Sequence, residues 1–178
     1  MAVDVQALRD LIRDIPDYPK PGVRFRDITP LIGHPEAFGN SINALVELYS
    51  DIPVDRVLGI EARGFIIAAP VAYRLGAGFV PVRKAGKLPW AVAREEYSLE
   101  YGTDKLEIHR DALLPGERVL IVDDVLATGG TAAATGRLVE GLGGVVAGYC
   151  FLIEIGALNG RHRLGERPIR SLINYFGD

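Results

Sequence analysis

Two consecutive carboxylates, Asp123 and Asp124, stand between an apolar run and a turn rich in threonine and glycine. The run Arg118–Val122 has the continuous Val/Leu/Ile composition of a buried parallel strand. The turn Ala127–Thr131 leads into a predicted helix, whose first N–H groups attract phosphate while glycine lets the anion approach the backbone. Carboxylates beside such a cradle need an uncharged partner, and a ribose diol fits because its hydroxyls donate to them. The pair would also stabilise positive charge that develops on the sugar ring.

An ordinary strand-to-helix turn is the alternative interpretation, with Thr128 as the helix cap. The apolar strand, the paired carboxylates and the two glycines occur together, which favours the sugar-phosphate interpretation. The residues predicted to bind the sugar phosphate are Asp123, Asp124, Ala127, Thr128, Gly129, Gly130 and Thr131. The sequence has neither the Gly-Lys-Ser/Thr ending of a P-loop nor a Gly-x-Gly-x-x-Gly dinucleotide turn, which argues against an NTPase or a nicotinamide dehydrogenase.

Two further polar segments follow predicted strands. Glu61–Phe65 follows Arg56–Ile60 and opens a helix, so its N–H groups and Arg63 suit an anion. The alternative is a plain helix start whose arginine makes a surface salt bridge. Arg83–Lys87 follows the strand Gly78–Val82 and places three cations around a glycine. It is either a solvated basic run or the start of a lid that closes on an anionic ligand.

These segments need a sheet that brings them to one edge. Apolar periodicity predicts strands at 56–60, 78–82, 118–122, 145–153 and 171–173, and helices at 3–14, 35–50, 64–75 and 130–142. Such alternation predicts a three-layer α/β/α domain with a mostly parallel central sheet. Because parallel sheets bind ligands at the carboxyl ends of their strands, the site is expected just after residues 60, 82 and 122.

Two stretches interrupt this alternation within an expected single domain, 1–178. Residues 16–33 are irregular and, with the first helix, form a small N-terminal hood over 1–33. Residues 83–110 are polar and glycine-punctuated, which is typical of a flexible lid or a small hairpin. Within them, alternation at 97–101 and 105–109 predicts a short two-stranded ribbon.

The totals exclude several classes of protein. A formal net charge of -3 argues against nucleic-acid binding by bulk charge. Cys150 is the only cysteine, which rules out an intrachain disulfide and a cysteine metal cage, and its apolar surroundings predict a buried thiol. Charges interrupt the apolar residues near the N-terminus and no run is long enough to span a bilayer, so we expect a cytoplasmic protein with no membrane partner.

The stretch Val119–Thr131 resembles the thirteen-residue signature of the type I phosphoribosyltransferases. The resemblance runs from about Tyr18 to Ile173 and points to the members that use adenine, through Gly22–Ile28, Glu61–Phe65, Arg83–Pro89 and Tyr97–Thr103. It implies an enzyme of purine salvage that transfers the 5-phosphoribosyl group of phosphoribosyl pyrophosphate (PRPP) to adenine, giving AMP and pyrophosphate. It also implies a homodimer, and Mg²⁺ that is carried by the diphosphate and has no direct protein ligand.

The resemblance also implies a role for individual residues. It assigns pyrophosphate binding to Glu61, Ala62, Arg63, Gly64, Arg83, Lys84 and Lys87, with a cis peptide bond between Glu61 and Ala62. It assigns adenine binding to the main chain at Arg24 and Arg26 and to the side chains of Phe25 and Val125. The catalytic residues are Arg63 and Glu100, whose carboxylate would exchange a proton with adenine N7.

Alternatives remain for several of these roles. Glu100 alone would be a solvated loop residue, and Phe25 could anchor its segment to the core. A transferase for hypoxanthine, guanine, xanthine or orotate is the nearest rival, although the segments around Phe25 and Tyr97 favour adenine. A non-catalytic regulator that senses PRPP is a rival of another class, but the sequence shows no basic recognition helix.

Overall fold

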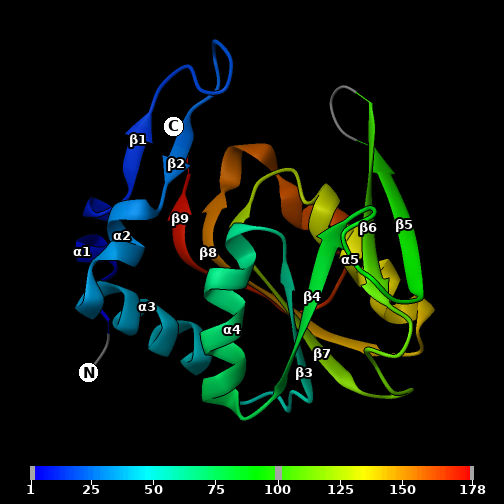
Figure 1. The fold of residues 1–178 in the computed structure, drawn as a ribbon. Helices are drawn as coiled ribbons and strands as arrows, with labels where there is room; N and C mark the ends of the chain where they lie inside the picture. Colours follow the sequence, from blue (N-terminus) through cyan, green and yellow to red (C-terminus); the bar gives the residue numbers. More distant parts are fainter. Residues whose placement is uncertain (1–2, 99–101, 177–178) are drawn as a thin grey trace. The chain divides into compact units, whose positions relative to one another are not determined.

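The computed structural model describes residues 3–98 and 102–176. The chain divides into two units, Met1–Ala44 and Leu45–Asp178, whose elements are labelled in Figure 1. Helix α3 (Pro35–Glu47) begins in the first unit and continues past its end. No helix among the described residues is long and apolar enough to cross a membrane. The cytoplasmic location stays a prediction.

The first unit holds helix α1 (Val5–Asp10), a two-stranded antiparallel ribbon of β1 (Arg13–Ile15) and β2 (Phe25–Asp27), and helix α2 (Thr29–Gly33). The prediction of one helix over 3–14 is therefore wrong in its second half. The helical pattern ends early because Arg13–Ile15 pairs with β2, so strand pairing overrides local helix propensity. Residues 16–33, predicted to be irregular, contain β2 and α2.

The second unit is built on a seven-stranded sheet in the order β5-β6-β4-β3-β7-β8-β9. Its strands are β3 (Arg56–Ile60), β4 (Gly78–Lys84), β5 (Val92–Ser98), β6 (Thr103–His109), β7 (Arg118–Leu126), β8 (Val145–Ile155) and β9 (Ile169–Tyr175). The strands β4, β3, β7, β8 and β9 are parallel, whereas β6 pairs antiparallel with β4 and β5. The predicted mostly parallel sheet is confirmed, including the fifth strand near Ser171.

Two helices cover opposite faces of this sheet: α4 (Arg63–Leu75) and α5 (Gly130–Gly141). Figure 1 shows α4 in front of the strands and α5 behind them. On the α5 side, Leu58, Ile121 and Leu138 belong to one continuous buried cluster. Cys150 on β8 is fully buried, and burial raises the pKa of its thiol to about 12. The thiol is inert in this setting, as predicted.

Strand β7 extends four residues beyond its predicted end at Val122. It stays paired with β8 up to Leu126, with Asp123 opposite Phe151 and Val125 opposite Ile153. The two aspartates therefore lie within the strand. A short 3-10 helix, η1 (Gly156–Leu158), and a second, η2 (Gly160–Arg163), follow β8.

The segment 83–110 contains two strands that join the sheet, β5 and β6. Strands β5 and β6 run antiparallel, and β6 also pairs with the end of β4 through Arg83 and Lys84. The predicted ribbon is present but begins earlier, at Val92. Trp90, the only tryptophan of the chain, lies between β4 and β5 and is 69% exposed. Glu100 lies outside the described residues.

Candidate active site

The turn between β7 and α5 encloses a cavity of about 80 Å³, lined by Asp123 and Val125–Ala132. Gly129 is the N-cap of α5, in the left-handed conformation with φ 79°, and no side chain caps the helix. Thr128 is therefore not the cap. Because the first N–H groups of a helix have no intrahelical partner, this end of α5 offers its donors to an anion in the cavity.

The paired carboxylates differ in their surroundings. Asp124 is buried, and its Oδ2 lies 2.6 Å from Nε of Arg63. The Oδ1 atom of Asp123 accepts a hydrogen bond of 2.9 Å from the N–H of Asp124. Part of the Asp123 side chain opens onto the cavity, yet burial raises its pKa well above the ordinary value, and the charge of Asp124 raises it further. The Asp123 carboxyl therefore keeps a proton to higher pH than an exposed aspartate does, and it faces a cavity where a polar ligand could replace water.

A glycine allows the second predicted turn to lie against these carboxylates. A Cβ atom at Gly64 would stand 2.6 Å from Oδ1 of Asp123, so only glycine lets the start of α4 come this close. The peptide bond between Glu61 and Ala62 is cis, as the resemblance implies. The two turns that the sequence predicted to bind pyrophosphate and sugar phosphate are therefore neighbours.

Glu61 accepts hydrogen bonds from residues at the end of β4 and in the loop that follows it. Its Oε1 accepts hydrogen bonds from Nζ of Lys87 at 2.6 Å and from a guanidinium nitrogen of Arg83 at 3.3 Å. Its Oε2 accepts from the N–H of Lys84 at 3.0 Å. Burial opposes ionisation of Glu61, but the bonds from Lys87, Lys84 and Arg83 outweigh it and lower the pKa to about 2. The side chain of Lys84 turns instead toward Asp104.

Sequence reasoning missed Glu107, which fixes the glycine between these cations. Glu107 lies on β6 opposite Arg83 and is 1% exposed. Its Oε2 accepts a 2.8 Å hydrogen bond from the N–H of Gly86, and its Oε1 accepts one from Nε of Arg94, also at 2.8 Å. The bond from Gly86 and the guanidinium of Arg94 lower the pKa of Glu107 despite its burial. Nothing in the sequence distinguishes it from the other acidic residues of the hairpin.

The predicted adenine-binding residues are divided between the units. Val125 lines the cavity of the second unit. Phe25 is in the first unit, where its ring packs edge-on against Tyr18 at a centroid distance of 5.2 Å. The side chains of Arg24 and Arg26 both form ion pairs with Asp14, at 3.2 and 3.0 Å. Adenine contacts at Phe25 stay a prediction.

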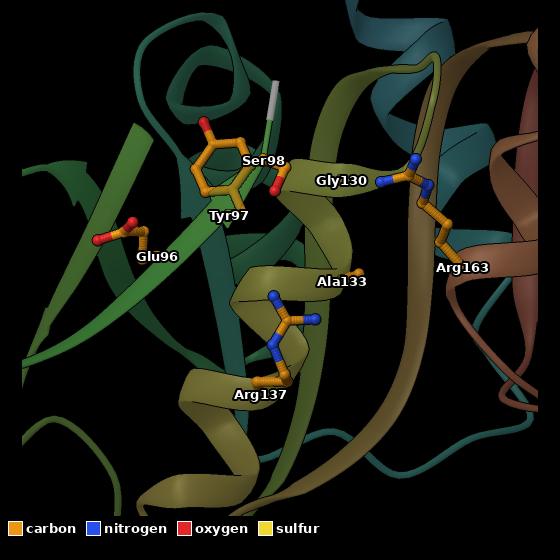
Figure 2. Close-up of a pocket in the computed structure, with 7 residues that line it drawn as sticks. All are labelled: Glu96, Tyr97, Ser98, Gly130, Ala133, Arg137 and Arg163. Carbon is orange, nitrogen blue, oxygen red and sulfur yellow. The ribbon is translucent and has the colours of Figure 1, made fainter. Parts of the chain in front are cut away.

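A larger cavity of about 440 Å³ shares Gly130 with the cavity at the β7–α5 turn, which we call the phosphate turn (Ala127–Thr131). Its lining comes from β5, α5 and η2: Glu96, Tyr97, Ser98, Gly130, Ala133, Arg137 and Arg163. Figure 2 shows Arg137 on α5 and Arg163 on η2, with Gly130 between the β5 residues and Arg163. Arg137 forms an ion pair with Glu95, and Glu96 adds a second negative charge. The mixed charge does not select one class of ligand.

The family model of the phosphoribosyl transferase domain matches residues 34–175, which include both turns and both carboxylates. The chain belongs to the phosphoribosyltransferase family. The resemblance found in the sequence is thereby confirmed over most of the chain.

Relatives of this phosphoribosyltransferase share almost its whole length. It is 59% identical to adenine phosphoribosyltransferase of Chloroflexus aurantiacus over 170 residues, which cover 96% of this chain and 98% of the relative. The crystal structure of adenine phosphoribosyltransferase from Thermoanaerobacter pseudethanolicus superposes with a TM-score of 0.95 at 52% identity, covering 96% and 99% of the two chains. The Saccharomyces cerevisiae enzyme, complexed with an imino-altritol bisphosphate and adenine, has a TM-score of 0.89 at 41% identity, covering 94% and 97%.

Proposed function

We infer that this chain transfers the 5-phosphoribosyl group from PRPP to adenine, giving AMP and pyrophosphate in purine salvage. The observation that carries this function is the start of α5, which has no side-chain cap and follows Asp123 and Asp124 across one short turn, with the Glu61–Gly64 turn packed against Asp123. One cavity edge thus offers donors for a 5′-phosphate, acceptors for ribose hydroxyls and a neighbouring anion site.

The reaction is a displacement at C1′ of the ribose. Adenine N9 attacks as pyrophosphate leaves, so positive charge develops on the ring in the transition state. Asp123 and Asp124 accept from the ribose hydroxyls, and their negative charge stabilises that developing charge. Arg63, held by its ion pair with Asp124, binds the departing pyrophosphate. Glu100 takes the proton from adenine N7 and returns it in the reverse reaction.

Pyrophosphate binding would rearrange the contacts around Glu61. In the structure, this carboxylate neutralises Arg83 and Lys87. A diphosphate carries more negative charge than one carboxylate and offers several oxygens to each cation, so it competes for both side chains. The transfer of Arg83 and Lys87 from Glu61 to the ligand would draw the segment after β4 over the sugar. Such closure keeps water away from a sugar cation that hydrolyses easily.

A magnesium ion that arrives with PRPP is part of this proposal. No group of three or more His, Cys, Asp or Glu among the described residues could hold a metal ion. Mg²⁺ is commonly bound by substrate phosphates, water and one or two carboxylates, and Asp123 and Asp124 are the carboxylates at hand. We propose that the ion is held mainly by diphosphate oxygens and water, where it neutralises charge on the leaving group.

Adenine recognition rests on the relatives and on the N-terminal segment. The yeast relative was crystallised with adenine and the Giardia lamblia relative, 38% identical, with 9-deazaadenine. The family resemblance assigns adenine contacts to Phe25, to Val125 and to the main chain at Arg24 and Arg26, and we propose these roles here. The ion pairs that both arginine side chains make with Asp14 are compatible with a main-chain role.

A homodimer is also proposed. Ile66, Ala69 and Tyr73 lie one or two turns apart on α4 and are all exposed, with Tyr73 85% accessible. An exposed apolar stripe on a helix is typical of a protein interface. In its own chain, Arg83 contacts Glu61 and the main-chain oxygen of Lys87.

A turnover assay with PRPP and Mg²⁺ tests the function. We expect AMP and pyrophosphate from adenine, and little product from hypoxanthine, guanine, xanthine or orotate. If another base is turned over as fast as adenine or faster, that base and not adenine is the preferred substrate. PRPP binding without turnover of any base would instead support a sensor of PRPP.

A further inference from the structure

Glu154 is a buried carboxylate that the proposed reaction does not use, and it lies beside the phosphate turn. On β8 it stands opposite Leu126, the last residue of β7 before Ala127. Glu154 is only 4% exposed. Because glutamate is almost never this buried unless it is paired, its partners indicate why it is there.

Arg161 is the principal partner of Glu154. Its Nε donates to Oε1 of Glu154 at 2.6 Å, and a terminal guanidinium nitrogen donates to Oε2 at 2.7 Å. The hydroxyl of Ser171 donates to the same Oε2, also at 2.6 Å. Burial raises the pKa of Glu154, but these hydrogen bonds outweigh it and leave the pKa below its ordinary value. The pair is therefore ionised at neutral pH and has the two-pronged geometry that arginine and carboxylate favour.

The residue before Arg161 touches the phosphate turn with its backbone. A Cβ atom at Gly160 would stand 2.3 Å from the carbonyl oxygen of Ala127 and 3.0 Å from the nitrogen of Gly129. Conversely, a Cβ atom at Gly129 would stand 2.4 Å from the carbonyl oxygen of Gly160. The two backbones are thus in direct contact, and η2 forms the outer support of the turn.

This support is a short element that needs an anchor. A 3-10 helix has poorer hydrogen-bond geometry than an α-helix, and η2 has only four residues. Arg161 ties it to β8 through Glu154, and to β9 through a 2.9 Å hydrogen bond from its remaining guanidinium nitrogen to the carbonyl oxygen of Ile169. This fork fixes the residue next to Gly160 to two strands of the sheet.

We propose that Glu154 and Arg161 are positioning residues that hold the Gly160 backbone against the Ala127–Gly129 turn, and so set the N–H groups that receive the 5′-phosphate of PRPP and AMP. This rests on the proposed function, in which that turn is the phosphate cradle. Neither side chain touches the substrate.

The test compares Arg161→Lys, Arg161→Gln and Glu154→Gln. A misplacement of about 1 Å can cost about a hundredfold, so a partial displacement of the turn should raise the KM for PRPP at least about tenfold in Arg161→Gln. The Kd for AMP, measured by calorimetry, should rise by a similar factor. The KM for adenine should change less than about threefold, because the proposed adenine contacts at Phe25 and Val125 lie outside the Ala127–Gly129 turn.

Arg161→Lys is the conservative variant, because it leaves a positive charge beside buried Glu154 and loses only the fork. Its KM for PRPP should lie between those of the wild type and Arg161→Gln. Arg170→Gln is the matched control: Arg170 makes a two-pronged ion pair with Asp51, at 2.6 and 3.1 Å. This control should keep its KM for PRPP.

Two results would overturn the proposal. One is an unchanged KM for PRPP in folded Arg161→Lys and Glu154→Gln. The other is a parallel rise in the KM for PRPP and adenine, which is what a general loosening of the fold produces. If Arg161→Gln does not fold, Arg161→Lys and Glu154→Gln decide the question. A distinct result would show that the Ala127–Gly129 turn does not bind the 5′-phosphate at all: in that case Gly129→Ala would leave AMP binding unchanged.

Discussion

Glu100 is the residue on which the proposed proton transfer depends. A neutral amide keeps the shape of the side chain but cannot take up a full proton. Glu100→Gln should therefore lower turnover with adenine by about a hundred- to ten-thousand-fold, the usual range for general acid–base catalysis. Binding of PRPP should change far less.

An adenine analogue with carbon at position 7 serves as the control, because it offers no N7 to Glu100. The mutation should matter much less for the residual turnover of this analogue. A loss below about threefold with adenine, well under the usual range, would make Glu100 a solvated loop residue.

The charged form of Asp123 should lower the free energy of unfolding at neutral pH although the proposed reaction needs it. Its folded pKa is raised by burial and by the charge of Asp124, so its contribution to stability is favourable at low pH and is lost as the pH rises through that folded pKa. Asp123→Asn should therefore raise the Tm at pH 7 while crippling turnover, and should lose its stability advantage as the pH falls below the ordinary aspartate value of about 3.9.

The control is Asp55→Asn, because ion pairing with Arg118 lowers the pKa of Asp55 to about 2. A group of this kind stabilises the fold above its unfolded pKa, and its contribution is lost as the pH falls toward its folded value. Asp55→Asn should therefore not raise the Tm at pH 7. Near-normal turnover in the double variant Asp123→Asn, Asp124→Asn would refute a role for the pair in holding ribose.

At the scale of elements, the turn into α5 offers a matched pair of glycines. Gly129 has φ 79° and a Cβ there would collide with the carbonyl oxygen of Gly160. At Gly130, a Cβ would meet its nearest neighbour, a guanidinium nitrogen of Arg163, at an ordinary 3.7 Å. Gly129→Ala should displace the turn and weaken both PRPP and AMP, whereas Gly130→Ala should bind both nearly as the wild type does.

Calorimetric titration with AMP measures this difference directly. Because a 1 Å misplacement can cost about a hundredfold, a loss of about tenfold or more is expected in Gly129→Ala. If both variants bind AMP with the affinity of the wild type, the 5′-phosphate binds elsewhere.

The strands and helices of the second unit were largely predictable, because their apolar runs are long and buried on both faces. The end of β7 was not. Asp123 and Asp124 break the apolar run that defines a strand, but the backbone pairing with β8 continues through them. In the first unit, Arg13–Ile15 carries a helical pattern and becomes a strand only because it pairs with residues 25–27. Pairing between distant segments cannot be detected by local periodicity.

The candidate site shows the same division. Asp123, Arg63 and the Gly129–Gly130 pair were predictable because they stand in or beside turns with a recognisable chemistry. Glu107 and Glu154 were not, because each is one acidic residue within a strand, and only the fold shows that it is buried beside a segment proposed to bind the ligand.

At the scale of the whole molecule, the apolar stripe on α4 predicts self-association. Tyr73→Asp would bury a charge in the interface, so it should convert dimers to monomers in sedimentation velocity. Leu114→Asp is the control, because Leu114 is 63% exposed and lies outside α4. A wild-type protein that sediments as a monomer at every concentration would refute the dimer.

The single tryptophan gives the chain a built-in optical reporter. Trp90 is exposed to water in the segment that carries Lys87, so its emission should be red-shifted and open to quenching by acrylamide. If that segment closes when PRPP and Mg²⁺ bind, the emission should shift to the blue and the quenching should fall, with Trp90→Phe as the dark control. If saturating PRPP leaves the emission unchanged, the indole stays exposed to water and the segment does not close over it. Because no second indole contributes, the same signal would follow opening and closing in a stopped-flow instrument without any added dye.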